Sequence, residues 1–213
     1  MNRVPNPLIA QMAENLQPVR LIKFRDGVVL VALAVLVTVL AVELLDGLWR
    51  GAWNGQASPF FVITNGLLLL LGCASANSVL TMASPRVGSS HDGPKWAMAM
   101  AAVVPLAAFA TLLGHDHGTT PLNDPYGLTC FGAGLTASLF TAGALVFWLR
   151  RGAPVTPERT GLLIGVASTA LGSAAYGLAC PISSVMHLGV WHVAPVAAGA
   201  LIGRFALPPL LRW

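Results

Sequence analysis

The sequence predicts an all-α membrane protein: a polytopic bundle of six transmembrane helices with a short amphipathic cytoplasmic segment at its N-terminus. Three observations lead to this fold class. Of the 213 residues, 55% are hydrophobic and only 9% are charged, whereas about a quarter of a soluble domain is charged. Six apolar stretches each approach the roughly 20 residues that a helix needs to cross the hydrocarbon core. If the six stretches cross the membrane in turn, the Lys and Arg residues lie almost entirely on one side of the membrane.

The first 25 residues form a separate N-terminal segment, ahead of a transmembrane domain that covers residues 26–213. Asn6 suits the N-cap and Pro7 the first position of a helix. Two interpretations of this helix are open: it rests on the inner leaflet, or its apolar face docks a cytoplasmic partner. The apolar side chains that recur at helical spacing include Leu8, Ile9, Met12 and Leu16.

Each of the six apolar stretches that follow predicts one transmembrane helix. The first is too long for a cleavable signal peptide and has no small-residue cleavage site after it. The third contains Pro105, a candidate kink. The fifth repeats small residues at every fourth position from Gly161 to Gly177, a spacing that favours close helix packing. The stretches are Val28–Leu48, Phe60–Thr81, Trp96–Leu113, Leu128–Leu149, Gly161–Leu178 and Val185–Leu207.

The basic residues set the expected orientation in the membrane. Of the twelve Lys and Arg residues, eleven precede the first stretch, lie between the second and third or the fourth and fifth, or lie near the C-terminus. Only Arg50 falls on the other side. Because cytoplasmic loops carry the excess of Lys and Arg, both termini are expected in the cytoplasm. The same bias accounts for the sequence pI of about 9.4, so we expect no direct contact with nucleic acid.

Metal-binding side chains gather on the opposite, outer side. Imidazole and thiolate suit copper and zinc, and thiolate selects the softer ions. In an oxidising compartment the two outer cysteines can instead form a disulfide. The outer residues are His115, His117 and Asp124 before the fourth stretch, Cys130 at its start, Cys180 after the fifth, and His187 and His192 at the start of the sixth.

Each of these residues, taken alone, has a plainer interpretation. A single cysteine is more often a small buried residue than a ligand, which is also how we interpret Cys73 in the second stretch. His187 and His192 are five positions apart and therefore do not share one face of a regular helix. No CxxC or HExxH spacing is present. Only the convergence of these residues on one side favours a functional site there.

Catalytic arrangements are not evident from the sequence. A haem-binding bundle would place histidines within the membrane, and none lies in the middle of a stretch. A transporter or proton pump would place carboxylates at mid-depth. We therefore expect a protein that is not an enzyme.

Six segments carry a resemblance to a known family. They are the opening LIAQMAENLQPVR, the first outer cysteine in GLTCFGAGL, the connection WLRRGAPVTPERTG, the second cysteine in AAYGLACP, the segment around Trp191, and the basic end LLRW. In order and spacing they resemble the NrsF-type membrane anti-sigma factors of bacteria, which are negative regulators of extracytoplasmic-function sigma factors of the sigma-F type.

The resemblance implies a six-helix protein of the bacterial inner membrane that holds a sigma factor inactive on its cytoplasmic side. It implies release of that partner when metal or oxidant stress acts on two outer cysteines, which match Cys130 and Cys180. It also favours docking of the sigma factor through Leu8, Ile9, Met12 and Leu16. No obligatory cofactor is expected. The expected signal is an oxidant or a soft or borderline metal ion such as copper, zinc or cadmium, with His115, His117, His187 and His192 as auxiliary ligands of the metal.

An alternative from another class is a small inner-membrane metal-handling or thiol-redox protein. A neighbouring sigma-factor gene would favour the anti-sigma factor. Oxidation of thiols with a quinone by the purified protein would favour the alternative.

Overall fold

The computed structural model describes residues 7–14, 22–83, 92–114, 124–152 and 154–211, and within these ranges the chain forms helices and no strand. The prediction of an all-α protein is therefore confirmed for the described part of the chain. The helices are α1 (Pro7–Glu14), α2 (Phe24–Leu45), the 3₁₀ turn η1 (Arg50–Ala52), α3 (Pro59–Met82), α4 (Gly93–Ala101), α5 (Val103–Gly114), α6 (Gly127–Ala137), α7 (Leu139–Leu149), α8 (Pro157–Gly177), α9 (Val185–Trp191), α10 (Ala194–Ala206) and α11 (Pro208–Leu211).

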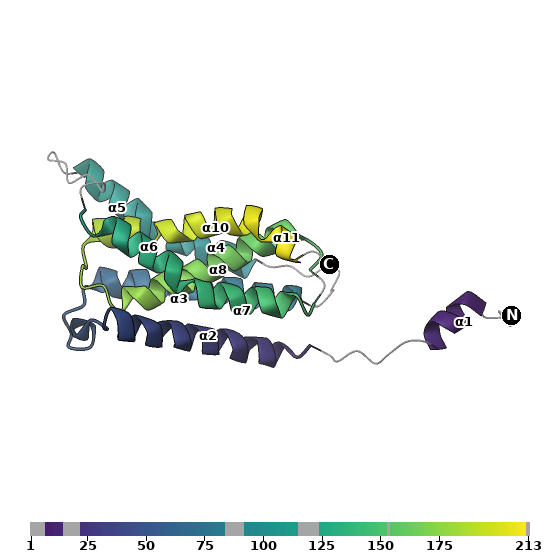
Figure 1. Ribbon diagram of the computed structural model, residues 1–213. Helices are drawn as coiled ribbons and strands as arrows, with labels where there is room; N and C mark the ends of the chain where they lie inside the picture. Colours follow the sequence, from purple (N-terminus) through teal and green to yellow (C-terminus); the bar gives the residue numbers. More distant parts are fainter. Residues whose placement is uncertain (1–6, 15–21, 84–91, 115–123, 153, 212–213) are drawn as a thin grey trace.

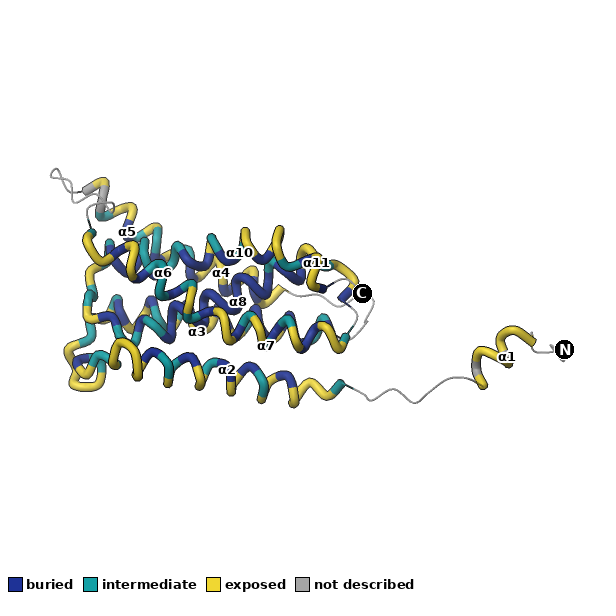
Figure 2. Tube along the Cα trace, in the orientation of Figure 1, coloured by how far each residue is buried: buried dark blue, intermediate teal, exposed yellow. Residues whose placement is uncertain are grey.

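The central element of the bundle is α8. It contacts α10, α3, α6, α7 and α2, which surround it (Figure 1). Sixteen of its 21 residues are buried, and Figure 2 shows it as the helix with the longest buried run. By contrast, α2 exposes one apolar side, on which Leu33, Leu36 and Leu40 each retain more than half of their accessible surface. An apolar outer surface of this extent is typical of helices that face lipid.

Small residues allow α8 to lie this deep. At Gly165 a Cβ atom would collide with the carbonyl oxygen of Gly199 on α10, and at Gly161 it would collide with that of Gly203. Only glycine permits the two backbones to approach this closely. The packing role predicted for the small-residue repeat of this stretch is thus confirmed.

Five helical segments of the described residues are long and apolar enough to cross a membrane. They correspond to five of the six predicted stretches, and the remaining stretch, Gly161–Leu178, forms α8. With 21 residues α8 is as long as the others, but it carries more small and polar residues. Its surroundings explain this composition, because a helix packed on all sides by protein does not need to present apolar side chains to lipid. The five segments are Phe24–Leu45, Pro59–Met82, Gly93–Thr111, Gly127–Leu149 and Val185–Ala206.

Three of these five segments are interrupted. The first break lies between α4 and α5 at Ala102. Pro105 follows three residues later. Because proline has no amide proton and its ring clashes with the carbonyl four residues earlier, the carbonyl of Ala101 lacks its helical hydrogen bond. Ser138 separates α6 from α7, and its Oγ donates to the carbonyl of Leu135 at 2.6 Å. The third break, at His192–Val193, precedes Pro195 and separates α9 from α10. The break near Pro105 agrees with the kink expected from this residue; the other two breaks were not predicted.

The two ends of the bundle differ in their side chains. At one end α2 begins, α7 ends and α8 begins (Figure 1). We call it the arginine end, after Arg25, Arg150, Arg151 and Arg159. At the opposite end α2 and α8 end and α6 begins. We call it the cysteine end, after Cys130 and Cys180.

The N-terminal helix α1 lies apart from the bundle, beyond the arginine end (Figure 1). It begins at Pro7, as the sequence predicts. Leu8, Ile9 and Met12 are 63%, 63% and 67% exposed, so their apolar side chains are accessible to a partner or a membrane. Leu16, the fourth predicted docking residue, lies outside the described residues.

Candidate functional site

Four residues from three segments meet at the cysteine end. Cys130 lies in the first turn of α6, Cys180 follows the end of α8 by three residues, His187 is on α9, and His192 directly follows α9. Their ligand atoms all lie within 4.8 Å of one another. All four side chains are buried, with at most 5% of their surface exposed.

The two cysteines and His187 make direct contacts. The sulfur atoms of Cys130 and Cys180 lie 3.9 Å apart. The Sγ atom of Cys180 lies 3.5 Å from Nε2 of His187. The rings of His187 and His192 are 5.4 Å apart between centroids.

The break after α9 brings the second histidine into this cluster. In a regular helix, positions five apart point in different directions, which is why the sequence did not place His187 and His192 together. Here the helix ends at Trp191 and resumes at Ala194. The His192 ring consequently turns toward His187. Its Nε2 atom is buried and has no hydrogen-bond partner.

Local contacts hold the three segments in place. At the start of α9 the hydroxyl of Ser184 accepts a hydrogen bond from the His187 amide at 3.2 Å, which caps the helix. The Trp49 amide donates to the carbonyl of Leu178 at 2.9 Å and fixes the chain just before Cys180. A Cβ atom at Gly127 would collide with the Trp191 indole, so this glycine permits the close approach of α6 to α9.

Asp124 is a fifth member of the site. Its Oδ2 atom lies 2.6 Å from Nδ1 of His187, and its Oδ1 atom accepts the Tyr126 amide at 3.0 Å. The sequence places Asp124 among the metal-binding side chains of the outer side but does not predict its contact with His187. The two partners are 63 positions apart, and nothing in their spacing signals the contact.

Hydrogen bonding also shapes the titration of the groups that lie outside the helical spans. The hydrogen bond between Cys130 and Cys180 lowers the pKa of the Cys180 thiol below its ordinary value, although burial opposes this. Burial alone would raise the pKa of Asp124, but hydrogen bonds from His187 and from backbone amides outweigh it and lower that pKa. Cys180 therefore ionises more readily than an ordinary cysteine, and Asp124 is a carboxylate that accepts a hydrogen bond from Nδ1 of His187.

The donor set fits a four-coordinate soft or borderline metal ion. Two thiolates on one zinc ion lie roughly 3.8 Å apart, and a thiolate and an imidazole nitrogen roughly 3.5 Å apart, if the bonds have tetrahedral angles and ordinary lengths. The observed separations of 3.9 Å and 3.5 Å are close to these values. His192 supplies the fourth donor, with a ring nitrogen within 4.8 Å of the other three ligand atoms. A disulfide, in contrast, would require the two sulfur atoms to approach by about a further 2 Å.

The structure describes four of the six cysteine and histidine residues predicted for the site. Cys130, Cys180, His187 and His192 come together, whereas His115 and His117 lie outside the described residues. Cys73 is on α3, exposed on the outside of the bundle, and takes no part in the cluster.

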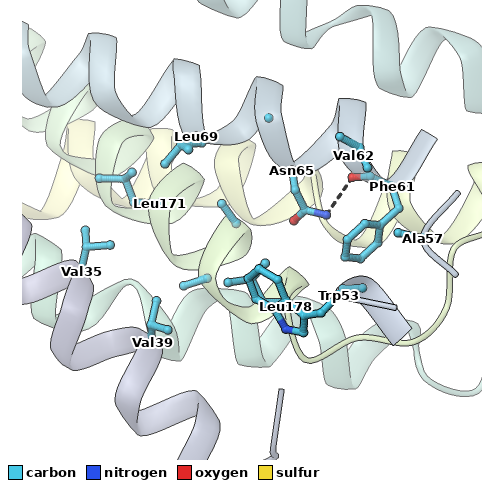
Figure 3. A pocket seen from close by; sticks show the side chains of 14 residues that line it. Val35, Val39, Trp53, Ala57, Phe61, Val62, Asn65, Leu69, Leu171 and Leu178 are labelled. Carbon is cyan, nitrogen blue, oxygen red and sulfur yellow. Dashed lines mark hydrogen bonds between the residues drawn. The ribbon is translucent and has the colours of Figure 1, made fainter. Parts of the chain in front are cut away.

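A separate pocket lies between α2, α3 and α8, with a volume of about 390 Å³. Its lining is almost wholly apolar, and Figure 3 shows side chains such as Val35, Leu69 and Leu171 facing it from the three helices. Asn65 is the polar exception. Its amide donates to the Phe61 carbonyl at 2.9 Å. Because this pocket has no titratable or metal-binding side chain, we assign the chemistry to the cysteine end.

Comparison with known proteins adds a family assignment. The sequence model of the family NrsF, described as negative regulator of sigma F, matches residues 12–213. The chain is also similar to the anti-sigma-F factor NrsF of Caulobacter vibrioides (strain NA1000 / CB15N), with 39% identity over 71 residues. That alignment spans 33% of each of the two chains. No solved structure matches.

Proposed function

The chain belongs to the NrsF family of negative regulators of sigma F, and on this premise we propose that it is an anti-sigma factor of the bacterial inner membrane. It sequesters a sigma-F-like extracytoplasmic-function sigma factor on its cytoplasmic face. It releases that partner when metal or oxidant stress acts on Cys130 and Cys180. The observation that carries this proposal is the buried cluster of two cysteines and two histidines at one end of the bundle.

In the proposed topology α8 is the fifth of six spans, in addition to the five segments named above, and both termini are cytoplasmic. The support is the distribution of charge, because Arg25, Arg150 and Arg159 lie at the arginine end and Arg50 lies at the cysteine end. The cysteine end would then face the periplasm, where metal ions and oxidants arrive. Residues 1–25 would form the cytoplasmic segment and residues 26–213 the membrane domain.

The sigma factor would bind at the arginine end, with α1 as one of its docking elements. Leu8, Ile9 and Met12 form an exposed apolar group on α1, and Leu16 continues the same helical spacing. Exposed apolar side chains of this kind anchor an amphipathic helix in the groove of a partner. Nucleic acid has no direct role in this proposal, since the basic residues serve to orient the protein in the lipid bilayer.

The signal would be a soft or borderline ion such as copper, zinc or cadmium, or an oxidant that joins the two cysteines. Cys130, Cys180, His187 and His192 would hold an ion, and no cofactor would be needed for folding. A ligand shifts a conformational equilibrium only by its differential affinity for the two states. Bonds from thiolate and imidazole to a metal can supply several kcal/mol of such preference.

The break at Ser138 offers a way to transmit this signal along the bundle. A ligand held by Cys130 and by the segment 180–192 would draw α6 toward α9. At Gly172 of α8 a Cβ atom would lie 2.7 Å from the Ser138 amide nitrogen, so the break packs directly on the central helix. We propose that α6 and α7 pivot at this contact, while the glycine packing keeps α8 and α10 together. The pivot would displace Arg150 and the connection that follows it at the arginine end.

Co-purification tests the proposed partner. Affinity-tagged chain, extracted from unstressed cells in mild detergent, is expected to retain a sigma factor at a ratio near one to one. Deletion of the gene is expected to raise transcription from promoters of that sigma factor. Recovery of no sigma factor, together with unchanged transcription, would overturn the assignment.

The alternative, a small inner-membrane metal-handling or thiol-redox protein, draws on the same cluster of cysteines and histidines. It predicts that the purified protein turns over without a cytoplasmic partner, by oxidising thiols with a quinone or by moving metal across a vesicle membrane. An anti-sigma factor would do neither.

A further inference from the structure

The carboxylate of Asp124 makes the shortest polar contact of the site, although it is not one of the four clustered donors. Its Oδ2 atom lies 2.6 Å from Nδ1 of His187. The His187 side chain is fully buried and that of Asp124 is 22% exposed. A short contact between a carboxylate and a fully buried imidazole restrains the orientation of the ring.

This contact determines which nitrogen of His187 faces the cluster. An ionised carboxylate can only accept a hydrogen bond, so Nδ1 of His187 must carry the proton. The other nitrogen, Nε2, points at Cys180 from 3.5 Å. In the neutral ring its lone pair is therefore directed at the position where the four donors converge.

Asp124 also connects two of the segments that build the site. Its Oδ1 atom accepts the Tyr126 amide at 3.0 Å, and its carbonyl oxygen accepts the Gly127 amide at 3.2 Å. These bonds fix the start of α6, on which Cys130 follows within one turn. The same carboxylate thus holds the helix that supplies a thiol and the imidazole that lies beside the other thiol.

We propose that Asp124 is a positioning residue of the sensor, which selects the ligand tautomer of His187 and joins the start of α6 to α9. This inference rests on the proposed function in one respect, namely that His187 is a metal ligand. Carboxylate partners behind a ligating histidine fix its tautomer and ring orientation, and their loss typically weakens metal binding by 10- to 100-fold.

Zinc titration against a competing chelator tests the proposal on full-length protein in lipid nanodiscs. We expect Asp124→Asn to weaken Zn²⁺ binding by about 10- to 100-fold and Asp124→Glu to restore most of it. The matched control is Asp46→Asn, at an exposed aspartate that follows α2 and is not part of the cluster. Wild-type affinity in Asp124→Asn would overturn the proposal.

Nitrogen-15 NMR of labelled histidine side chains provides a readout that does not depend on metal. His187 of the wild-type protein is expected as the Nδ1–H tautomer, and Asp124→Asn is expected to change its Nδ1 and Nε2 shifts, whereas Asp46→Asn is not. If the wild-type protein bound no zinc but this tautomer was present and depended on Asp124, the positioning role would stand and metal sensing would fail. A wild-type His187 without a proton on Nδ1 would overturn the positioning role itself, and so would NMR shifts that Asp124→Asn leaves unchanged.

Discussion

The two ends of the bundle present opposite chemistry to their surroundings. At the cysteine end, four potential ligands are buried and in contact with one another. Beyond the arginine end, α1 leaves Leu8, Ile9 and Met12 more than 60% exposed. A buried cluster of soft ligands suits a small ion or oxidant, whereas an exposed apolar helix face suits a large partner. In the proposed function, detection and partner binding are divided between the ends, and the helices between them must couple the two.

The largest expected effect comes from breaking the packing between the ends. At Gly165 a side chain would collide with the backbone of α10, and overpacking costs about 1–3 kcal/mol even where neighbours can move. We expect Gly165→Leu to destabilise the bundle by about 3 kcal/mol or more and to abolish both repression and response. Thermal unfolding in detergent measures the first effect and a sigma-dependent reporter measures the others.

The matched control for this substitution is Gly143→Leu on α7. A Cβ atom at Gly143 would meet nothing within 4 Å, so the variant should unfold and repress as the wild type does. Equal damage from both variants would show that α8–α10 packing has no special role.

Removal of the thiols should affect the cysteine end alone. Cys130→Ser combined with Cys180→Ser replaces two soft donors by hydroxyls, which bind copper and cadmium poorly. We expect repression to be retained and induction by these metals or by oxidant to be lost, as measured with the same reporter. Cys73→Ser is the control, because Cys73 lies outside the cluster. Normal induction in the double variant would end the idea of a thiol switch.

The converse change acts beyond the arginine end. Burial of a leucine side chain contributes roughly 1.5–3 kcal/mol, so Leu8→Asp with Leu16→Asp should weaken sigma-factor binding by about 10²-fold or more. Reporter transcription should then be constitutive and independent of metal. Gln11→Asp places one such charge on the same helix at a polar position and should repress normally. Full repression by the Leu8, Leu16 double variant would leave α1 as a helix that rests on the membrane.

A smaller but sharper test concerns which end faces the periplasm. In a variant without native cysteines, Asn54→Cys between α2 and α3 should react with an impermeant thiol reagent on intact spheroplasts, because it lies at the cysteine end. Val155→Cys, 80% exposed in the native protein and located between α7 and α8, should react only after lysis. The reverse pattern would place the proposed sensor in the cytoplasm.

The order and type of the elements could be predicted from the sequence because they depend on local features. Long apolar stretches predict the helices, Pro7 marks a helix start, and Pro105 marks a break. Close packing of α8 against another helix was also accessible, since every fourth residue of α8 is small, but the sequence did not identify α10 as that helix. The membership of Cys130 and Cys180 in one site followed from their shared side of the membrane in the expected topology.

What could not be predicted depends on contacts between distant segments. His192 joins the cluster only because the helix breaks after Trp191. Pro195 leaves the carbonyl of Trp191 without a helical hydrogen bond and so favours a break there, but it does not predict that the two histidine rings meet. Asp124 reaches His187 across 63 positions, and Gly127 makes room for Trp191 through tertiary packing alone. Such features depend on how the helices pack against one another. The spacing of apolar residues along a single helix does not determine that packing.

Release of the sigma factor from the purified complex in nanodiscs tests the coupling between the two ends most directly. The complex is immobilised through the sigma factor, and dissociation of the membrane protein is followed after addition of Cd²⁺, Cu⁺ or Zn²⁺, or of hydrogen peroxide. We predict that at least one of these agents accelerates dissociation of the wild-type complex. The complex formed with the Cys130→Ser, Cys180→Ser variant should remain intact under every condition. Equal dissociation of the two complexes, or none from either, would contradict a sensor at the cysteine end that controls a partner at the other.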